Sequence, residues 1–444
     1  MRFICSVDNG KEGINLEIPY NLITTISPVR GKKINTVDKK SKYVVKVMAP
    51  VELEETLFKY AENFFEAAHM ITEFILYAEH PDIGKLDMYF FPIAFLYRHC
   101  IELGLKAIGF QYIEDKAERQ RLIKDTRHNL FEILSVVKEK STVKRPEEEI
   151  EWMEKYFADL TKTDRESDSF RYPFHIVWEK DEWGLGGKFV VKPVFNEQID
   201  IDLVKFANKF EAAYEIIQKW YKKETDSAAE WKDVKPIFIE TGGYYYSQSV
   251  VGYKYSREVF YPYTEAYLET ANYLKWYMKM QTDKENADFK ERLFLPMCYL
   301  YRNCVELSLK AIWFEETGED FQKKCKIMLD NKHSIGGMWK NIKPYVLKYN
   351  SDGEKYIEVI EDYCMQLHTI DSDANKFRYP MSNSIQPYFS HNKRFDFIET
   401  GDFLEALNNI LDGIANELNT MNEIKAEMQE EYYSYLQEDM DYYL

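Results

Sequence analysis

The chain has 444 residues, more than one hydrophobic core usually accommodates, so we expect two domains or one core built twice. Its 45% apolar and 16% aromatic residues argue against a disordered or fibrous protein. The formal net charge of −17 argues against a broad surface for nucleic acid, because phosphate binding depends on clustered Lys and Arg. Only a local basic pocket remains compatible with that charge.

The sequence also limits the cofactors and the compartment that we expect. Its six cysteines show no CxxC or metal-finger spacing, so we expect reduced thiols, no bound metal and no cofactor. The start, MRFICSVDNGKEG, has no apolar run of signal-peptide length. The longest uncharged apolar run, 88–97, is about half of a bilayer span. We therefore expect a cytoplasmic protein that does not enter the membrane.

An internal repeat organises the chain. Residues 97–108 read YRHCIELGLKAI and residues 301–312 read YRNCVELSLKAI, identical at nine of twelve positions. FRYP also occurs twice, at 170–173 and 377–380. The sequence therefore predicts two copies of one unit, at 51–222 and 258–421. Around them we expect a strand-containing N-terminal segment at 1–50, a connecting segment at 223–257 and an acidic, Tyr-rich tail at 422–444.

The periodicity within each unit is helical. In chain order, helices are predicted at 52–80, 92–110, 128–140, 147–163 and 201–222, and then at 261–281, 296–314, 334–348, 352–369 and 401–421. Pro92 and Pro296 are expected in the first turns of their helices, where a missing N–H costs little. The last helices of the two units are aligned on Asp202 and Asp402.

Strands are predicted as a minority. KYVVKVM at 42–48 is β-branched, and 175–178 with 188–195 form a predicted hairpin that turns at GLGG, 184–187. A second hairpin is expected where Gly242 and Gly243 precede YYYSQSVVGYKY. The expected fold class is therefore mainly α: two tandem homologous bundles of about five helices each, packed as a pseudo-twofold internal dimer with small β-hairpins.

Candidate functional residues lie on the second helix of each unit. That helix is apolar except for three residues at four-residue spacing, Arg98, Glu102 and Lys106, which recur as Arg302, Glu306 and Lys310. Four-residue steps keep them on one stripe. A buried charge is costly unless it is paired, so the stripe must face partner groups or a wet cleft. The other repeated polar residues are the expected partners: His128 and His333, Asp164 and Asp371, Arg171 and Arg378.

Two interpretations of this repeated set remain open. In the structural one, Arg, Glu and Lys form an ion-pair ladder, and the Asp and the FRYP arginine hold a loop against it. In the functional one, the set lies in a cleft, where Arg binds phosphate oxygens and His supplies acid–base chemistry. The first unit is the better candidate for activity, because its His99 and His175 are replaced by Asn303 and Ser382 in the second.

Tandem helical units with YRHCIELGLK, RHNL and FRYP resemble the HEPN (higher eukaryotes and prokaryotes nucleotide-binding) class. The resemblance implies helical bundles that often dimerise, and activity as a metal-independent RNase of a bacterial defence or toxin–antitoxin system. Arg98-His99 and Arg302-Asn303 match the start of the HEPN nuclease motif. The motif's His, which follows after four to six intervening residues, is absent from both copies.

A nuclease of this class would therefore require a rearranged catalytic set, which we draw from Arg98, His99, His128, Arg171 and His175. RNA or a nucleotide, a protein encoded in the same operon and a second copy of the chain are the partners that the resemblance implies. The alternative is a non-catalytic HEPN-like scaffold or protein-interaction module, in which the repeated residues are structural.

Overall fold

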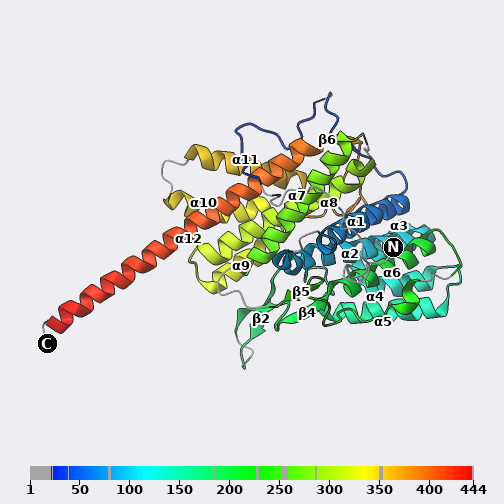
Figure 1. Cartoon of the computed structure of the whole chain (residues 1–444), viewed down its shortest axis with the longest axis horizontal. Helices are drawn as coiled ribbons and strands as arrows, with labels where there is room; N and C mark the ends of the chain where they lie inside the picture. The colour runs from blue at the N-terminus through cyan, green and yellow to red at the C-terminus, as the bar shows by residue number, and fades with distance from the viewer. Residues whose placement is uncertain are drawn as a thin grey trace.

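We describe the protein from a computed structural model, which covers residues 22, 24–38, 40–78, 82–183, 186–226, 230–252, 259–285, 288–349 and 354–442. The described residues form twelve α-helices and three two-stranded antiparallel sheets, so the predicted mainly α fold is confirmed (Figure 1). Among these residues, no helix is both long and apolar enough to cross a lipid bilayer.

Each half of the chain contains six α-helices in its described part, one more than the predicted five. The first half contains α1 (Leu53–Leu76), α2 (Ile83–Tyr112), α3 (Lys116–Thr126), α4 (Leu130–Lys140), α5 (Glu147–Thr163) and α6 (Leu203–Tyr221). The second half contains α7 (Tyr261–Asp283), α8 (Asp288–Ala311), α9 (Phe321–Asn331), α10 (Ile335–Tyr349), α11 (Glu354–Ile370) and α12 (Phe397–Tyr442). A π-helical turn, Ile312–Glu316, follows α8, and a short 3-10 helix spans Glu230–Asp233.

The unpredicted helices are α3 and α9. Each is mostly polar and buries only two residues, so neither has the broad apolar face by which the longer helices were predicted. Each is instead started by a capping aspartate. The side chain of Asp115 accepts a hydrogen bond from the backbone N–H of Glu118, and Asp320 caps α9 in the same way.

The central helices α2 and α8 begin earlier than predicted, so Pro92 and Pro296 lie inside them and not in their first turns. An interior proline removes one hydrogen bond and costs about 3 kcal/mol. In α2 that cost is offset by burial, because Leu86, Tyr89 and Phe90 before the proline are fully buried. Each large apolar side chain that is fully buried contributes about 1.5–3 kcal/mol.

Two of the sheets join the halves reciprocally. Strand β1 (Val44–Val47) precedes α1 but pairs with β6 (Lys393–Asp396), which leads into α12. Strand β5 (Gln248–Val251) precedes α7 but pairs with β4 (Ile199–Asp202), which leads into α6. The predicted strand at 42–48 is therefore present. The hairpin predicted after Gly242 stays a prediction, because residues 253–258 of its second arm lie outside the described part; the described strand of that segment, β5, pairs with β4.

The sheet registers correct one detail of the repeat. Val44 pairs with Asp396, and Gln248 pairs with Asp202. Both aspartates also cap their helices, since Asp202 accepts from the N–H of Lys205 and Asp396 from that of Glu399. The counterpart of Asp202 is therefore Asp396, not Asp402. Asp402 lies inside α12, where it forms an ion pair with Lys275 at 2.9 Å.

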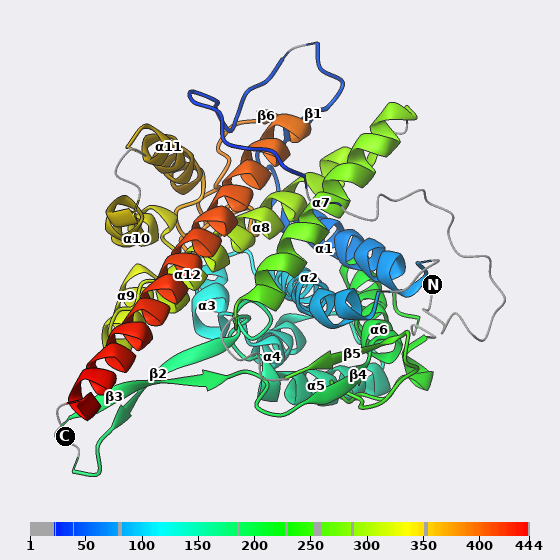
Figure 2. The ribbon, with the colours of Figure 1, turned by 60° about the vertical axis from the view of Figure 1, so that its left-hand side comes forward.

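The third sheet is the predicted hairpin, formed by β2 (Phe174–Lys180) and β3 (Gly187–Pro193). It projects from the first half toward α9, as Figure 2 shows, and the side chain of Gln322 bonds both the N–H and the carbonyl of Phe189. Gly184 and Leu185 of the predicted turn lie outside the described residues.

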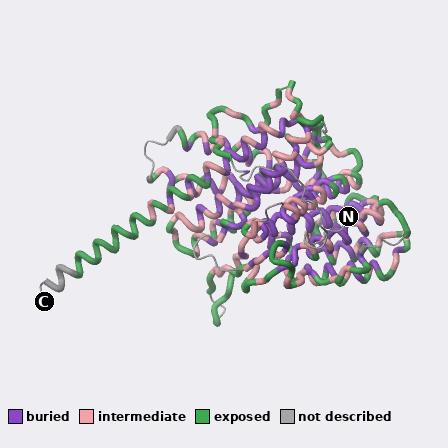
Figure 3. Tube along the Cα trace, viewed as in Figure 1, coloured by how far each residue is buried: buried purple, intermediate pink, exposed green. Residues whose placement is uncertain are grey.

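The acidic tail continues α12 as a helix up to Tyr442, which extends away from the body (Figure 1). From about residue 423 to 437 its side chains are exposed (Figure 3).

The halves pack against each other through their first two helices, α1 against α8 and α2 against α7. Phe95 of α2 stacks on Tyr299 of α8 with 4.6 Å between the ring centroids. Such reciprocal contacts are what an internal dimer predicts. The pseudo-twofold symmetry itself stays a prediction.

Candidate functional site

The repeated polar residues of the first half form one buried cluster around Arg98. Its Nη1 donates to Glu102 at 2.6 Å, its Nε lies 2.8 Å from the carboxylate of Asp164, and its Nη2 donates to the backbone carbonyl of His128. Arg98 and Glu102 are fully buried, and Asp164 is 1% exposed. All three branches of the guanidinium are thus engaged by protein groups, which makes Arg98 a structural centre.

Glu102 is the second centre of this cluster. It accepts from the ammonium of Lys106 at 2.7 Å and lies 3.1 Å from Nδ1 of His128. Tyr379, which belongs to the second half, donates its hydroxyl proton to the same carboxylate at 2.8 Å. Burial alone would raise the pKa of Glu102, but Lys106, His128 and Arg98 hold that pKa well below its usual value. Glu102 is therefore an anion at neutral pH.

The second half repeats the cluster around Arg302, which bonds Glu306 and donates to the carbonyl of His333 at 2.6 Å. Asp371 lies 3.3 Å from Nε of Arg302. Glu306 accepts from Lys310 at 2.7 Å and lies 3.0 Å from Nδ1 of His333. Its tyrosine comes from the first half: Tyr172 donates to Glu306 at 2.6 Å.

The aspartates explain how the tyrosines reach the opposite half. Asp164 follows α5 and accepts from the backbone N–H groups of Asp168 and Ser169, both at 3.0 Å. This turn leads directly into FRYP and so positions Tyr172. Asp371 holds the equivalent turn in the second half through the N–H groups of Asn375 and Lys376. In each half, the Asp holds the FRYP segment in place, and the tyrosine of that segment hydrogen-bonds the Glu of the other half.

Arg171 does not join Arg98. Its Nη2 donates to the hydroxyl of Tyr172 at 2.8 Å, and its Nε lies 3.5 Å from the side-chain oxygen of Asn303, so it belongs to the second cluster. Arg378 lies near the first cluster but is held by its own loop, through the carbonyl of Ala374 at 2.6 Å. The structure thus brings Arg98 and His128 together and places Arg171 with the opposite half.

The other two predicted histidines lie outside the clusters. His99 is fully buried, with Nε2 3.1 Å from the carbonyl of Arg378, and burial lowers its pKa well below the ordinary value. Its neutral ring therefore donates that hydrogen bond. His175 lies in β2, 3.5 Å from Asp168, which raises its pKa.

His128 is partly accessible to solvent, since 31% of its side chain is exposed. Burial lowers its pKa below 6.5 although Glu102 acts to raise it, so the ring is neutral at pH 7. A carboxylate accepts only, so Nδ1 carries the proton, and Nε2 is left as a proton acceptor. His333 has the same arrangement: Glu306 acts to raise its pKa, but burial and the nearby cations lower it overall.

A pocket of about 470 Å³ opens beside His128, between the first half and the loop that follows the second FRYP. Four basic side chains line it: Lys106, Lys124, Arg127 and His128. Tyr379, Asn375 and Ser382 are among its other polar residues, and no Asp or Glu is among the described residues that line it. In a protein of net charge −17, this pocket is a local site suited to an anion.

The turn before His128 has an unusual backbone in both halves. Arg127 has φ 47°, and Lys332, before His333, has φ 49°. Such conformations are strained for non-glycine residues and persist only when surrounding contacts hold them. Here the guanidinium of Arg98 or Arg302 holds the carbonyl of the following His. The buried arginine thereby fixes the histidine at the edge of the pocket.

Sequence reasoning missed several residues of this site. Tyr379 and Tyr172 stand in the repeated FRYP, so the repeat itself carried the signal. Lys124 and Arg127 line the pocket from α3 and the turn after it, a helix too polar to be recognised. No metal-ligand cluster of three or more His, Cys, Asp or Glu occurs in the described part of the chain.

No family model, curated protein or solved structure matches the chain.

Proposed function

We propose that the chain binds a phosphate-bearing ligand, a nucleotide or RNA, in the His128 pocket, as a HEPN-like protein of bacterial defence or toxin–antitoxin type. The observation that carries the proposal is the pocket's charge: the cations Lys106, Lys124 and Arg127 line it beside the neutral His128, and no acidic side chain is among its described lining residues. Lys and Arg bind phosphate oxygens, and their local grouping fits an acidic protein in which we expect no broad basic surface.

Metal-independent RNA cleavage is the reaction that this arrangement favours. Nε2 of His128 accepts the proton of a ribose 2′-hydroxyl, the 2′-oxygen attacks the adjacent phosphorus, and the bond to the 5′-oxygen breaks. The leaving oxygen takes a proton from water, and a 2′,3′-cyclic phosphate and a 5′-hydroxyl result. Glu102 acts as a positioning residue, because it holds the Nδ1 proton and so leaves Nε2 as the base. Lys106 and Arg127 would balance the charge on the phosphate.

The test compares wild type with His128→Ala on labelled single-stranded RNA and on total RNA, with and without EDTA. His333→Ala is the matched control. In the second cluster, His333 contacts Glu306 and Tyr172 as His128 contacts Glu102 and Tyr379, and its exposure is similar. We expect cleavage in EDTA to be lost in His128→Ala and kept in His333→Ala, whereas RNA binding, which depends on the cationic side chains, should persist in both variants. Wild type that neither binds nor cleaves RNA or nucleotides would refute the proposal.

The second candidate function is a non-catalytic scaffold. It is favoured by the burial of Arg98, Glu102 and Asp164, which have no access to a ligand, and by the exchange of Tyr172 and Tyr379 between the halves. The scaffold would predict intact folding and no ligand at the pocket. Equal RNA binding by wild type and Lys124→Glu/Arg127→Glu, which would place RNA at a site insensitive to the pocket's charge, would support it.

A further inference from the structure

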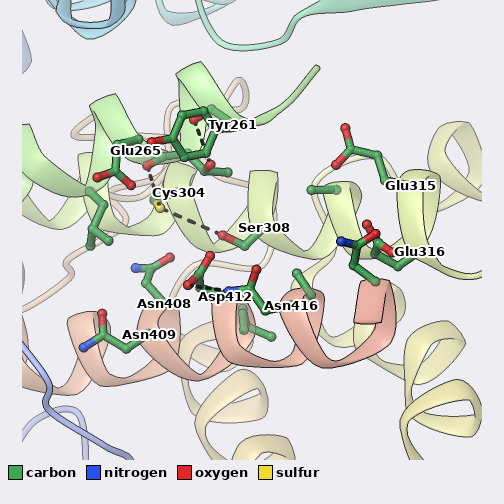
Figure 4. A pocket seen from close by; sticks show the side chains of 16 residues that line it. Tyr261, Glu265, Cys304, Ser308, Glu315, Glu316, Asn408, Asn409, Asp412 and Asn416 are labelled. Atoms are coloured by element: carbon green, nitrogen blue, oxygen red, sulfur yellow. Dashed lines mark hydrogen bonds between the residues drawn. The ribbon is translucent and has the colours of Figure 1, made fainter. Parts of the chain in front are cut away.

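A second pocket, of about 320 Å³, lies within the second half among α7, α8 and α12 (Figure 4). Ligand pockets typically enclose about 300–1,000 Å³. Four carboxylates line this pocket, those of Glu265, Glu315, Glu316 and Asp412. No Lys, Arg or His is among its described lining residues, so its charge is opposite to that of the His128 pocket.

The duplication explains why this space is open in the second half. In the first half, Tyr214 and Tyr221 of α6 fill the corresponding space: Tyr214 stacks on Phe65 at 4.0 Å and Tyr221 on Phe58 at 3.7 Å. When α12 is aligned with α6 on their capping aspartates, Asp396 and Asp202, Asn408 corresponds to Tyr214 and Ala415 corresponds to Tyr221. Two aromatic rings are thus replaced by an amide and a methyl group, which leaves room beside α8.

The replacement amide is itself short of a partner. Asn408 is 2% exposed, and its Nδ2 donates to the carbonyl of Leu404 at 3.0 Å. Its Oδ1 is buried and accepts no hydrogen bond from the described residues. Figure 4 shows this side chain extending from α12 into the space below α8. An unsatisfied buried acceptor costs about 1–3 kcal/mol, so this oxygen favours a ligand that donates a hydrogen bond.

The pair Glu265 and Asp412 favours the same kind of ligand. Glu265 and Asp412 face each other from α7 and α12; burial first, and then repulsion from Glu269 and Asp412, raise the pKa of Glu265 to about 7. Burial also raises the pKa of Asp412, which accepts one hydrogen bond, from Asn416 at 3.2 Å. A cation between them would relieve this repulsion.

The lining favours an organic cation over a metal ion. The described residues contain no group of three His, Cys, Asp or Glu close enough to hold a metal. Leu268, Leu411 and Ala415 add apolar wall suited to methylene groups. Glu265 lies at one end of the pocket in Figure 4 and Glu315 with Glu316 at the other, which suits a ligand with a positive charge at each end.

We propose that this pocket binds an aliphatic di- or polyamine. One ammonium group donates to Glu265, Asp412 and Oδ1 of Asn408, the methylene chain lies along Leu268 and Leu411, and a second ammonium group lies near Glu315 and Glu316. This site is separate from the His128 pocket and does not depend on the function proposed for it.

The test is calorimetric titration of the full chain with putrescine and spermidine, and separately with MgCl2, at pH 8, where Glu265 is ionised. We expect saturable heat with the amines, and a melting temperature that rises with amine concentration. Absence of both in wild type would overturn the proposal. So would equal saturation by Mg²⁺ at the same concentration, since that would identify a site for simple cations.

Three variants locate the binding. Glu265→Gln and Asp412→Asn each remove one charge-assisted acceptor and should weaken amine binding about tenfold or more. Because each also removes repulsion, both variants should melt no lower than wild type. Ala415→Phe restores first-half bulk and should abolish binding through filling of the pocket. The control is Glu62→Gln on α1, which removes the same charge outside the pocket and should bind as wild type. Unchanged binding in all three pocket variants would refute the assignment.

Discussion

The hydroxyl of Tyr379 donates a hydrogen bond to the carboxylate of Glu102, a residue 277 positions earlier in the chain, at 2.8 Å. Tyr172 makes the reverse contact with Glu306. Each half therefore completes the buried polar cluster of the other. This exchange of tyrosines makes the contact between the halves more specific than apolar packing alone would. If either tyrosine were removed, a buried carboxylate would lose a hydrogen bond, which is costly.

Removal of either hydroxyl should destabilise the protein. Tyr379→Phe and Tyr172→Phe each lose a hydrogen bond to a buried anion, worth about 1.5–3 kcal/mol in the free energy of unfolding. Urea denaturation measures the loss. Tyr244→Phe is the control, because Tyr244 is 45% exposed and should change stability by less than about 0.5 kcal/mol. Two tyrosine variants as stable as the control would show that the exchanged contacts are not needed.

Arg98→Ala should destabilise more severely, by about 3–5 kcal/mol, because it leaves Glu102 and Asp164 buried with too few partners. Arg302→Ala should behave alike. Arg165→Ala serves as the exposed comparison, since the side chain of Arg165 is 61% exposed and its ion pair with Glu132 is worth little. Equal unfolding midpoints for Arg98→Ala and Arg165→Ala would contradict the structural role of Arg98.

Two glycines test how differently the last helices pack. A Cβ at Gly104 would lie 2.6 Å from Cγ2 of Ile217, so Gly104→Ala should cost about 1–3 kcal/mol through overpacking of α2 against α6. A Cβ at Gly413 on α12 would meet no atom within 4 Å, so Gly413→Ala should stabilise by about 0.5–1 kcal/mol. Thermal melting of both variants shows whether each substitution raises or lowers the stability. Stabilisation by Gly104→Ala would argue against the close approach.

The acidic pocket predicts a pH dependence of stability. The pKa of Glu265 is about 7 in the folded chain, above its ordinary value of 4.5, so the folded state binds this proton more tightly than the unfolded state. The contribution of Glu265 to the free energy of unfolding is therefore fully present below about pH 4.5, and it is lost as the pH rises to about 7. Glu265→Gln should reduce the fall in melting temperature across that range. The facing groups are Glu269, Asp412 and Lys85, which the variant leaves in place. An unchanged slope would show that Glu265 is not the group concerned.

Much of the fold could be predicted because buried residues are apolar and recur in the sequence at the period of a helix or a strand. The long amphipathic helices, β1 and the β2–β3 hairpin correspond to apolar or alternating residues. The helix starts at Ile83 and Asp288 could not be predicted from Pro92 and Pro296, because tertiary burial outweighs the local cost of an interior proline. The pairing of β5 with β4 is equally non-local and leaves no signal in the residues between them.

The candidate site was predictable in composition but not in arrangement. Four-residue spacing correctly grouped Arg98, Glu102 and Lys106, and repetition identified His128 and Asp164 as their partners. Repetition alone could not show that the FRYP segments cross between the halves, so Arg171 was grouped with the wrong cluster. The basic pocket also depends on Lys124, which belongs to the unpredicted helix α3, and on Arg127, which precedes His128 directly but was not singled out as a site residue.

The most direct test of the central claim is RNA binding by a variant that changes only the pocket's exposed charges. Lys124→Glu/Arg127→Glu alters two exposed lining residues outside the buried network, and Lys332→Glu changes the residue that corresponds to Arg127 in the second half. We predict that fluorescence anisotropy with single-stranded RNA shows about tenfold or greater weakening and a shallower salt dependence for the double variant. Lys332→Glu should stay within about twofold of wild type. Equal binding by the double variant and wild type would contradict a phosphate-binding function for the His128 pocket.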